Sequence, residues 1–450
     1  MEDTIAAIAT AYGEGGIGII RISGEDSRDI LRKIFTGKIE SRRKKKKKIM
    51  DENEHIDEVL AVYMKGPKTY TGEDVVEINC HGSMVALRKT LALVLSKGAR
   101  MAEPGEFTKR AFLNGRLDLS QAEAVIDVIK AKSDRSFDVA ISQLEGSLSK
   151  RIEKIRQALL DLLVEVTVNI DYPDEDIEIM TYDKARDCLC NIRNMIGELL
   201  ATSGSGRMIR EGIRIAIVGK PNVGKSSLMN CLLRESRAIV TEIPGTTRDT
   251  IEEAVSIRNL PVYLIDTAGI RDTDDTVEKI GIEKTKEAFN NADYIILVVD
   301  GSRPLTSEDE EIISYVRGRR ALVLLNKRDL GAEVTVDVIS EKLPYCDIIE
   351  TALSKGEGLK EIEDNIESLV YGGQISQGES LMVNNVRHID LLKQADSAAG
   401  DALSLLEIME PLDIVEIDIR NAYDFLGEIV GDTVSDEIIN EVFARFCLGK

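Results

Sequence analysis

The sequence lacks any run of 18 or more apolar residues, so no segment of it has the length and composition of a membrane-spanning helix. Its first residues, MEDTIAAIATAYGEGG, are acidic and have only a short apolar part. They therefore resemble neither a secretory signal nor a transit peptide. No internal repeat occurs along the chain. These absences exclude an integral membrane protein and a repeat array, and we expect a cytoplasmic protein.

Cysteine is scarce for a chain of 450 residues, and the few cysteines are scattered. They are Cys80, Cys188, Cys190, Cys231, Cys346 and Cys447. No four of them have the spacing of a metal site, and in a chain this long they indicate reduced thiols rather than a disulfide framework.

Positive charge is in deficit, since the formal net charge is −21. This balance argues against a general nucleic-acid coat, although binding follows the local field and not the total charge. The local exception is the run RRKKKKK over residues 42–48. We interpret it as a solvated, mobile loop, with a contact to RNA phosphates as the alternative.

The first 118 residues alternate short strands and helices. Apolar, β-branched runs at 17–22, 59–64 and 75–79 are bounded by glycine or proline and predict strands. Helix-like stretches cover 84–95 and 107–113. This pattern predicts a compact α/β unit.

From residue 119 the pattern becomes helical. Apolar residues at steps of three and four from Ile141 to Ile170 predict one long helix, which ends before Pro173. A second helix is expected over 181–201, and the Gly/Ser stretch 203–206 is interpreted as a linker.

Strands and helices alternate again over residues 213–370. The strand candidates are 213–218, 262–265, 294–299 and 321–325. Apolar strands separated by helices predict a mainly parallel sheet that is covered on both faces. After Gly372–Gly373 the chain is helical to its end, and we expect this tail to pack on the helices of 119–205.

The segment Gly219–Ser226, GKPNVGKS, follows a predicted strand and opens a helix, which is the context of a phosphate-binding P-loop. Its glycines let successive backbone N–H groups face phosphate oxygens. Lys225 is expected to reach the β- and γ-phosphates, and Ser226 to supply an oxygen to Mg²⁺. Alone, the motif also fits an ATPase.

Motifs at the ends of the following strands narrow the choice of base. Asp266-Thr-Ala-Gly269 sits where a carboxylate can hold the Mg²⁺ shell. In Asn326-Lys-Arg-Asp329, Asp329 can accept two hydrogen bonds from guanine that adenine cannot offer. The backbone N–H of Ala352 is expected to meet guanine O6. Order and spacing together predict GTP.

The segment Gly245–Asp249, GTTRD, lies where a nucleotide-sensing first switch belongs. Thr247 is the candidate for a second Mg²⁺ hydroxyl, and an ordinary polar loop is the alternative. The predicted GTP-binding residues are Asn222, Val223, Gly224, Lys225, Ser226, Ser227, Thr241, Glu242, Ile243, Pro244, Gly245, Thr246, Thr247, Asp266, Thr267, Ala268, Gly269, Asn326, Lys327, Asp329 and Ala352.

The hydrolytic machinery must differ from that of Ras, because the position of its water-orienting Gln is Ile270 here. Asn222, inside the P-loop, could ligate a monovalent cation against the phosphates. Glu278 could orient water, but by itself it is one acidic residue among several.

These patterns define an α/β plus all-α protein, in which a Ras-like P-loop G domain is inserted into a helical domain and preceded by a small α/β domain. The predicted segments are 1–118 (N-terminal α/β), 119–211 (helical, first part), 212–373 (G domain) and 374–450 (helical, second part).

The chain resembles the tRNA-modification GTPase family MnmE (TrmE) from end to end. The stretches that carry the resemblance, besides the G motifs, are GIIRISG (18–24), TGEDVVE (71–77), PGEF (104–107), AFLNGRLD (111–118), DYPDE (171–175) and the final CLGK (447–450). The last of these is similar to the family's closing Cys-Ile-Gly-Lys, with one conservative change.

The resemblance implies a K⁺-dependent GTPase that acts with an FAD-containing partner, MnmG (GidA). Together they would add an aminomethyl-type group, of the carboxymethylaminomethyl kind, to C5 of the wobble uridine (position 34) of certain tRNAs. It also implies a one-carbon donor of the 5-formyltetrahydrofolate type, a homodimer held by the N-terminal domains, and a heterotetramer or larger complex with MnmG. The chain has no GxGxxG fingerprint of its own for a flavin.

Site residues follow from the resemblance by position. Glu278 would be the catalytic carboxylate, and Asn222, Thr241, Ile243 and Thr246 the K⁺ ligands. The folate-binding residues would be Arg21, Glu77, Arg116 and Lys450, with Cys447 beside them in an open chemical role. Without the resemblance, Arg21 and Glu77 fit a surface ion pair better. Other members can carry Lys where Arg116 stands, so charge is kept while geometry can differ.

Two other kinds of function share the G motifs. A ribosome-associated or translation-related GTPase switch would need neither the N-terminal folate positions nor a CLGK terminus. A structural G-domain scaffold would hydrolyse GTP only feebly.

Overall fold

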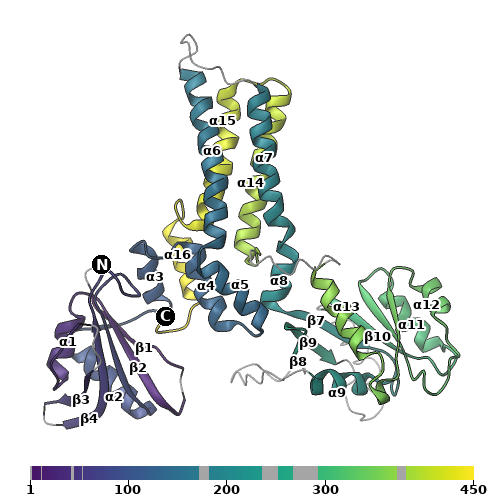
Figure 1. Ribbon diagram of the computed structural model, residues 1–450, viewed down its shortest axis with the longest axis horizontal. Helices are drawn as coiled ribbons and strands as arrows, with labels where there is room; N and C mark the ends of the chain where they lie inside the picture. Colours follow the sequence, from purple (N-terminus) through teal and green to yellow (C-terminus); the bar gives the residue numbers. More distant parts are fainter. Residues whose placement is uncertain are drawn as a thin grey trace. The chain divides into compact units, whose positions relative to one another are not determined.

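The computed structural model (Figure 1) describes residues 3–11, 13–41, 45–52, 54–171, 182–235, 252–266, 292–371 and 382–450. The chain forms two compact units, each of which is described by itself. The first comprises Met1–Ile126, Gln143–Arg193 and Gln394–Lys450, and the second Asp127–Ser142 and Asn194–Lys393. The predicted borders at 118, 211 and 373 stay predictions.

The first unit contains the N-terminal sheet, which among the described residues has six strands in the order β3-β4-β5-β2-β1-β6. Its strands are β1 (Ile5–Ile8), β2 (Gly15–Ser23), β3 (Lys45–Asp51), β4 (Glu54–Met64), β5 (Val75–Gly82) and β6 (Arg100–Met101). Its helices are α1 (Ser27–Ile34), α2 (Met84–Ser96) and α3 (Glu106–Leu113). Neighbouring strands are antiparallel except β1 and β6. The predicted α/β unit is confirmed, with β1, β3 and β6 added.

The two faces of this sheet have different roles. On β2, Ile20 and Ile22 are fully buried in one cluster with apolar residues of α1 and α2. Arg21, between them, projects to the opposite face because side chains alternate along a strand. There its guanidinium lies 5.7 Å from the ring of Phe107 on α3. The predicted folate-binding residues Arg21 and Glu77 lie on this second face, paired across β2 and β5.

Helices that precede and follow the second unit's sheet in the sequence complete the first unit. They are α4 (Leu119–Lys130), α6 (Ser147–Asp171), the start of α7 (Tyr182–Ala201), the later part of α14 (Val386–Glu407), α15 (Leu412–Val430) and α16 (Asp436–Ala444). Figure 1 shows α15 running beside α6, and Arg156 of α6 forms an ion pair with Asp432 just after α15. The C-terminal tail therefore packs on the earlier helices, as predicted.

Three local expectations were wrong. The single helix over 141–170 is instead α5 (Asp134–Leu144) and α6, because Gly146 between them adopts a positive φ of 83° that breaks a helix. The Gly/Ser stretch is no linker but the start of α8 (Ser203–Glu211). Gly206 is required there for close packing, since a Cβ would lie 2.4 Å from the Val383 carbonyl oxygen.

The third correction concerns the basic run, which was interpreted as a mobile loop. Its residues from Lys45 onward form strand β3, paired antiparallel with β4 over Lys45–Asp51. Residues 42–44 lie outside the described residues. Lysine is a poor strand former, so the run carries no strand signal of its own, and pairing with β4 decides its conformation instead.

The second unit contains a sheet of the order β12-β11-β10-β7-β9-β8, six strands among the described residues. Its strands are β7 (Ile213–Val218), β8 (Glu252–Ile257), β9 (Leu260–Asp266), β10 (Tyr294–Asp300), β11 (Ala321–Asn326) and β12 (Asp347–Glu350). Its helical elements are α9 (Lys225–Glu235), α11 (Ser307–Val316), α12 (Val336–Lys342), η1 (Leu353–Lys355) and α13 (Leu359–Tyr371), beside α5 and α8.

This sheet is parallel except for β8, and an apolar cluster covers each of its faces. On β10, Ile296 and Val298 belong to one cluster while Ile295 and Leu297 belong to the other. The predicted mainly parallel, doubly covered sheet is confirmed. Parallel strands bring their carboxyl ends to one edge, and that edge carries the predicted motifs. Within the described ranges, no helix combines the length and apolar composition needed to cross a membrane.

Substitution of Phe443 on α16 tests how much the packing of the C-terminal tail contributes to stability. It is 2% exposed and packs against Phe446 and Phe112 with ring centroids 5.3 and 6.3 Å apart. We expect Phe443→Ala to lower the free energy of unfolding by about 3 to 5 kcal/mol, measured by urea unfolding followed by circular dichroism. Phe137→Ala is the control, since Phe137 is 45% exposed. Equal small effects of both changes would contradict this packing role.

Candidate functional site

The loop after β7 has its predicted shape, and two of its glycines cannot be replaced. Gly219 has a φ of +144°, and a Cβ there would lie 2.3 Å from the Val298 carbonyl oxygen of β10. Gly224 has a φ of +117°, and its Cβ would lie 2.1 Å from Nδ2 of Asn326. Backbone conformation and close packing thus both demand glycine, and the loop is pressed against the strand ends.

Lys225 opens α9 and lies in the mouth of this loop. Its side chain is largely buried, and its Nζ donates to the carbonyl oxygens of Gly219 and Lys220 at 2.6 and 2.7 Å. An ammonium fixed above the loop is the arrangement expected for binding phosphate oxygens. Asn222 stands at the tip of the loop with a positive φ of 61°.

Asn326 ties three loops together. Its Nδ2 donates to the carbonyl oxygen of Val223 in the P-loop at 2.8 Å. Its Oδ1 accepts from the N–H of Leu353 at 3.1 Å and from the hydroxyl of Thr351 at 3.2 Å. Asn326 is 3% exposed, so these bonds form without competition from water. The P-loop and the loops predicted to bind the base are therefore held by one amide.

Lys327 is held by a residue that the sequence analysis missed. Its Nζ donates to Oδ2 of Asp300, the last residue of β10, at 2.7 Å. Oδ1 of Asp300 accepts from the N–H and the hydroxyl of Ser302 at 3.1 and 2.6 Å. Burial opposes ionisation of Asp300, but the hydrogen bonds from Lys327 and Ser302 outweigh it and lower the pKa of this carboxyl. Its place at the carboxyl end of a parallel strand was the signal that could have found it.

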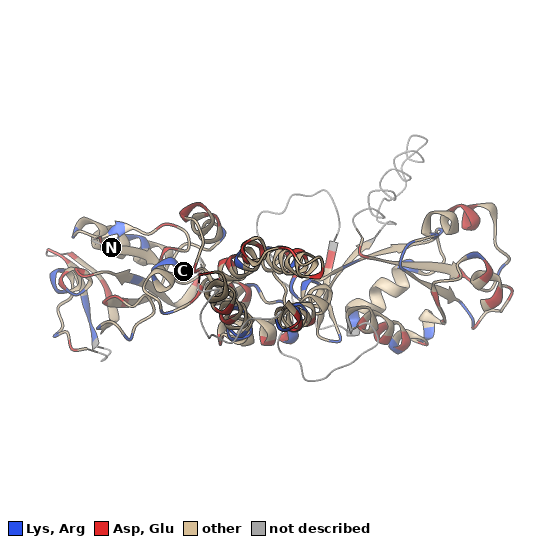
Figure 2. Ribbon diagram, turned by 90° about the horizontal axis from the view of Figure 1, so that it is seen from above, with Lys and Arg blue, Asp and Glu red and all other residues tan. Residues whose placement is uncertain are grey.

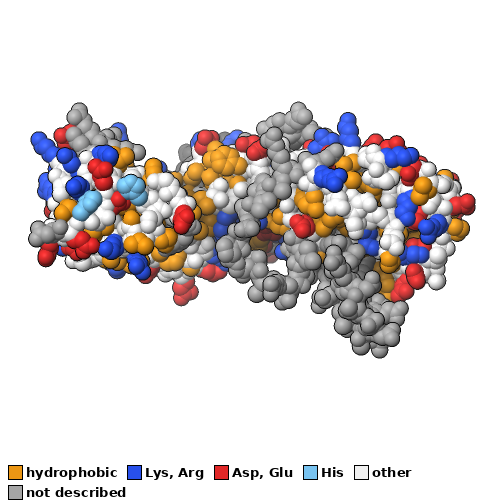
Figure 3. All heavy atoms as spheres, turned by 90° about the horizontal axis from the view of Figure 1, so that it is seen from below, with side chains coloured by type: hydrophobic (Ala, Val, Ile, Leu, Met, Phe, Trp, Pro, Cys, Tyr) orange, Lys and Arg blue, Asp and Glu red, His pale blue; other side chains and the backbone are white. Residues whose placement is uncertain are grey.

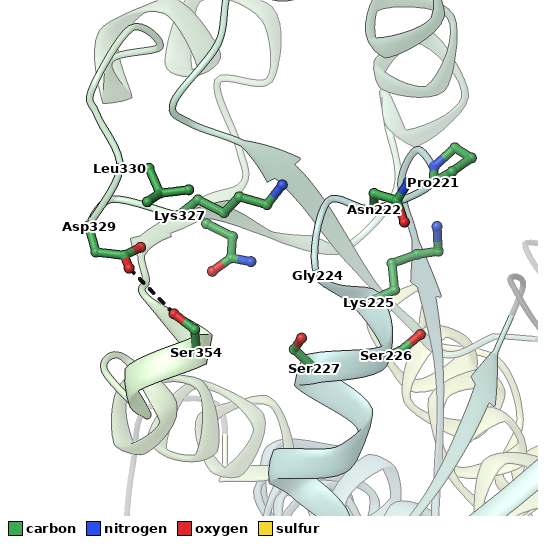
Figure 4. Close-up of a pocket in the computed structure, with 11 residues that line it drawn as sticks. Pro221, Asn222, Gly224, Lys225, Ser226, Ser227, Lys327, Asp329, Leu330 and Ser354 are labelled. Atoms are coloured by element: carbon green, nitrogen blue, oxygen red, sulfur yellow. Dashed lines mark hydrogen bonds between the residues drawn. The ribbon is translucent and has the colours of Figure 1, made fainter.

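A cavity of about 690 Å³ opens between these loops (Figure 4). Its lining residues are Pro221, Asn222, Gly224, Lys225, Ser226, Ser227, Asn326, Lys327, Asp329, Leu330 and Ser354. In Figure 4, Lys225 and Ser226 stand at one end and Asp329 and Ser354 at the other. Ser354 Oγ donates to Asp329 at 3.5 Å. The residues predicted to bind phosphate and those predicted to bind the base thus lie at opposite ends of the cavity, which we call the phosphate end and the base end.

Most of the predicted nucleotide residues that the structure describes meet at this cavity, and two lie beside it. Val223 is buried below the loop, and its carbonyl carries the bond from Asn326. Ala352 is 1% exposed and its N–H donates to the Glu357 carbonyl oxygen at 3.2 Å, so Ser354 rather than Ala352 forms the wall. Sequence reasoning missed Ser354 because three-residue motifs do not fix which residue of a loop faces inward.

The remaining predicted nucleotide-binding and catalytic residues lie where the structure describes only the backbone or does not describe the chain. Asp266 ends β9 at the same sheet edge, and its side chain is not described. Thr241, Glu242, Ile243, Pro244, Gly245, Thr246, Thr247, Thr267, Ala268, Gly269, Ile270 and Glu278 lie outside the described residues. Their roles stay predictions.

A second cluster of predicted residues lies on the N-terminal sheet. Nε and Nη2 of Arg21 donate to Oε1 of Glu77 at 3.1 and 2.9 Å. The guanidinium of Arg21 lies 5.4 Å from the ring centroid of Tyr70, and that of Arg116 lies 4.9 Å from it. Nη1 of Arg116 also donates to the Tyr70 carbonyl oxygen at 2.7 Å. One aromatic ring therefore brings two arginines together.

The C-terminal residues join this cluster. Gly449 lies against β1, since a Cβ there would be 2.2 Å from the Ile8 carbonyl oxygen. The charges of Arg21 and Glu77 act on the Lys450 ammonium. Burial, and then the positive charge of Arg21, lower the pKa of the Lys450 ammonium. Cys447 is exposed, and its carbonyl accepts from the Gly105 N–H at 3.4 Å.

Taken together, the strand-to-helix P-loop, the amide that joins it to the base-binding loops and the carboxylate at the base end define a GTP-binding protein of the Ras-like P-loop class. Residues 4–116 match the family model described as GTP-binding protein TrmE N-terminus, and residues 119–447 match the MnmE helical domain. The chain belongs to the MnmE (TrmE) family.

Relatives support this assignment over the full length. The chain is 53% identical over 457 residues to the tRNA modification GTPase MnmE of Clostridioides difficile, with all of both chains covered. It is 52% identical to that of Alkaliphilus metalliredigens, again over all of both chains. It is 49% identical to that of Bacillus cytotoxicus, with 100% of this chain and 99% of the relative covered. Among solved structures, the G domain of the T. maritima FeoB iron transporter aligns with 35% of this chain and 97% of its own, at 24% identity. Its TM-score of 0.27 is too low to support an argument.

The base end of the cavity can be tested by exchanging one atom. We expect Asp329→Asn to weaken GDP binding by at least about 100-fold, because two hydrogen bonds to an ionised acceptor are lost. The new amide can donate to the 2-oxo group of xanthine, so xanthosine diphosphate should bind more tightly than it does to the unchanged protein. Fluorescent-nucleotide titration measures both. Asp337→Asn, on the exposed surface of α12, should change neither affinity, and unaltered base preference in the Asp329 variant would remove this residue from the base site.

Proposed function

We propose that the chain hydrolyses GTP in a K⁺-dependent manner and acts in tRNA modification. With an FAD-containing partner of the MnmG kind, it would add a carboxymethylaminomethyl-type group to C5 of the wobble uridine of certain tRNAs, using a folate-bound one-carbon unit. The observation that carries the proposal is the cavity joined by Asn326, in a chain related over its whole length to proteins named tRNA modification GTPase MnmE.

The phosphate end of the cavity suits GTP with Mg²⁺. Lys225 offers a fixed ammonium to the β- and γ-phosphates, and the Ser226 hydroxyl lines the cavity beside it. Ser226, with Thr247, would hold Mg²⁺, which neutralises charge on the phosphates when bound. At the other end, Asp329 selects guanine and Lys327 lies along the base, fixed by Asp300.

A monovalent cation fits the same phosphate end. The family's K⁺ ligands would be Asn222, Thr241, Ile243 and Thr246. Of these, Asn222 lines the cavity with an oxygen-bearing side chain and a positive φ, which turns the loop tip toward the phosphates. A K⁺ there supplies positive charge that an arginine supplies in other GTPases.

The N-terminal cluster suits a folate. Arg21, Arg116 and Lys450 provide three cations and only Glu77 is acidic, so the cluster favours a ligand with carboxylates. Glu77 can accept from the N–H groups of a pterin ring. Its ion pair with Arg21 orients the carboxylate and does not argue against this role, because one of its oxygens is left for a ligand. Cys447 borders the cluster. The chain would act as a homodimer in the cytoplasm, where its tRNA substrates are.

The cation dependence is the first measurement to make. We expect GTP turnover by the purified chain to be much faster in K⁺ than in Na⁺ at equal ionic strength. Asn222→Ala should reduce that difference at least about tenfold while GDP binding persists, since the base end is untouched. Asn191→Ala, on the exposed surface of α7, is a matched control. Equal turnover of the unchanged protein in both salts would remove the cation mechanism and leave only nucleotide hydrolysis.

Glu278 is tested by a separate substitution. We expect Glu278→Ala to retain GTP binding but to lose turnover by about 100-fold or more, because a water-orienting base contributes roughly this much. Asp274→Ala removes a neighbouring carboxylate and should hydrolyse GTP normally. Single-turnover assays separate binding from hydrolysis, and undiminished hydrolysis in the Glu278 variant would end that assignment.

A further inference from the structure

Charge is distributed unevenly along the chain. Residues 1–118 contain 21 Lys and Arg against 18 Asp and Glu, whereas residues 119–450 contain 37 against 61. The first segment is therefore net positive by 3, and the remainder net negative by 24. The net charge of the first segment therefore attracts a polyanion, whereas the net charge of the remainder repels it.

Within that segment the positive charge is concentrated on β3. In Figure 2 the lysine-rich ribbon appears blue at the end of the N-terminal sheet, and Figure 3 shows many Lys and Arg side chains over the same part. Lys46 and Lys48 oppose Leu60 and Glu58 of β4, so both lie on one face of the sheet. Lys47 projects to the other face, where its Cγ packs beside Gly37. The strand is at the sheet edge, so lysines line the rim on both sides.

The lysines are fixed in place by the residues that follow them. Ile49 is fully buried in the cluster under α1 and pairs with Phe35. The Thr36 N–H donates to the Lys48 carbonyl oxygen at 3.2 Å, and the Lys48 N–H donates to the Thr36 hydroxyl at 3.3 Å. A strand anchored in this way holds the Cα atoms of Lys46 and Lys48 about 6.8 Å apart on one face. Binding to such an ordered row costs less conformational entropy than binding to a loop.

Neighbouring carboxylates neutralise this row only in part. Lys46 Nζ lies 3.1 Å from Glu58, but the two side chains are 66% and 47% exposed, and such exposed pairs are weak. Among the described residues, Lys47 and Lys48 form no ion pair. The ammonium groups of Lys47 and Lys48 are therefore available to a ligand, and that of Lys46 is held only by a weak, exposed pair.

We propose that Lys46, Lys47 and Lys48 of β3 bind the phosphate backbone of RNA, and that this edge strand is a tRNA contact of the N-terminal domain. The proposal rests on the proposed function, in which tRNA is the substrate. It adds a binding surface separate from both the GTP cavity and the folate cluster. A row of lysines reads no sequence, so the contact positions the RNA without selecting bases.

The experiment compares full-length proteins in tRNA binding by fluorescence anisotropy over a range of salt concentrations, with an unmodified tRNA transcript as probe. We expect K46Q/K47Q/K48Q to weaken binding at least about tenfold at low salt and to reduce the slope of log affinity against log salt by about 2 to 3. K46R/K47R/K48R keeps the charge and should bind as the unchanged protein does. K150Q/K154Q/K360Q removes three exposed lysines elsewhere and is the matched control.

Five outcomes would overturn the proposal. Unchanged tRNA affinity in the Gln variant, or no tRNA binding by the unchanged protein, excludes this contact. Equal losses in the matched control mean that only net charge matters. If the Gln variant binds poly-glutamate more weakly than the unchanged protein does, but binds tRNA equally well, the ligand of the lysines is an acidic protein surface. The Gln variant can also aggregate while its monodisperse fraction binds tRNA normally. In that case the lysines serve only to keep the edge strand from pairing with other molecules. K⁺-stimulated GTP turnover, measured on the same samples, tests the proposed function separately.

Discussion

The hydrogen bonds of the Asn326 amide are the interaction on which the nucleotide site depends. The P-loop, the strand end at Asn326 and the loop after β12 come from distant parts of the sequence, and each is only a few residues long. None of them could hold its shape alone. The donor of one buried amide goes to the Val223 carbonyl, and its acceptor takes both Thr351 and Leu353. Loss of this side chain would leave three buried backbone or hydroxyl groups without partners, which costs more than the bonds themselves contribute. The distance between the phosphate end and the base end of the cavity is therefore set by a side chain that lies largely beneath it.

The N-terminal cluster is assembled on a comparable plan, but by the end of the chain. Gly449 fits against β1 only because it lacks a side chain, and the following Lys450 interacts electrostatically with Arg21. The packing of Phe443 and Phe446 on Phe112 supplies the apolar contact that holds the tail there. A short terminal segment would otherwise fray, because its few polar contacts cannot offset its conformational entropy. The aromatic cluster of α16 thus allows the last four residues to belong to a site more than 300 residues away in sequence.

Much of this architecture could be predicted, and the failures have physical causes. The parallel sheet, its covering helices and the P-loop follow from apolar periodicity and from glycine spacing, which act locally. The helix break at Gly146, the helical start at Ser203 and strand β3 were missed, because each is decided by contacts with distant residues. At the site, Asp329 and Lys225 were found from motifs, whereas Asp300 was not. Asp300 acts through Lys327, and only the alignment of β10 with β11 places the two side by side.

Both sites share a way of presenting positive charge. Lys225 rests on the carbonyl oxygens of its own loop, Lys327 on Asp300, and Arg116 on the Tyr70 carbonyl. A flexible cation that is already held in one orientation loses little rotamer entropy when an anion arrives. The holding groups are mostly neutral dipoles, so they orient the charge without cancelling it. The carboxylate of Asp300 offsets much of the charge of Lys327, which suits this cation to packing along a neutral base rather than to binding phosphate. The holding group thus sets how much positive charge each cation offers to a ligand: more for Lys225 and Arg116, which rest on carbonyl oxygens, and less for Lys327 and Arg21, which rest on carboxylates.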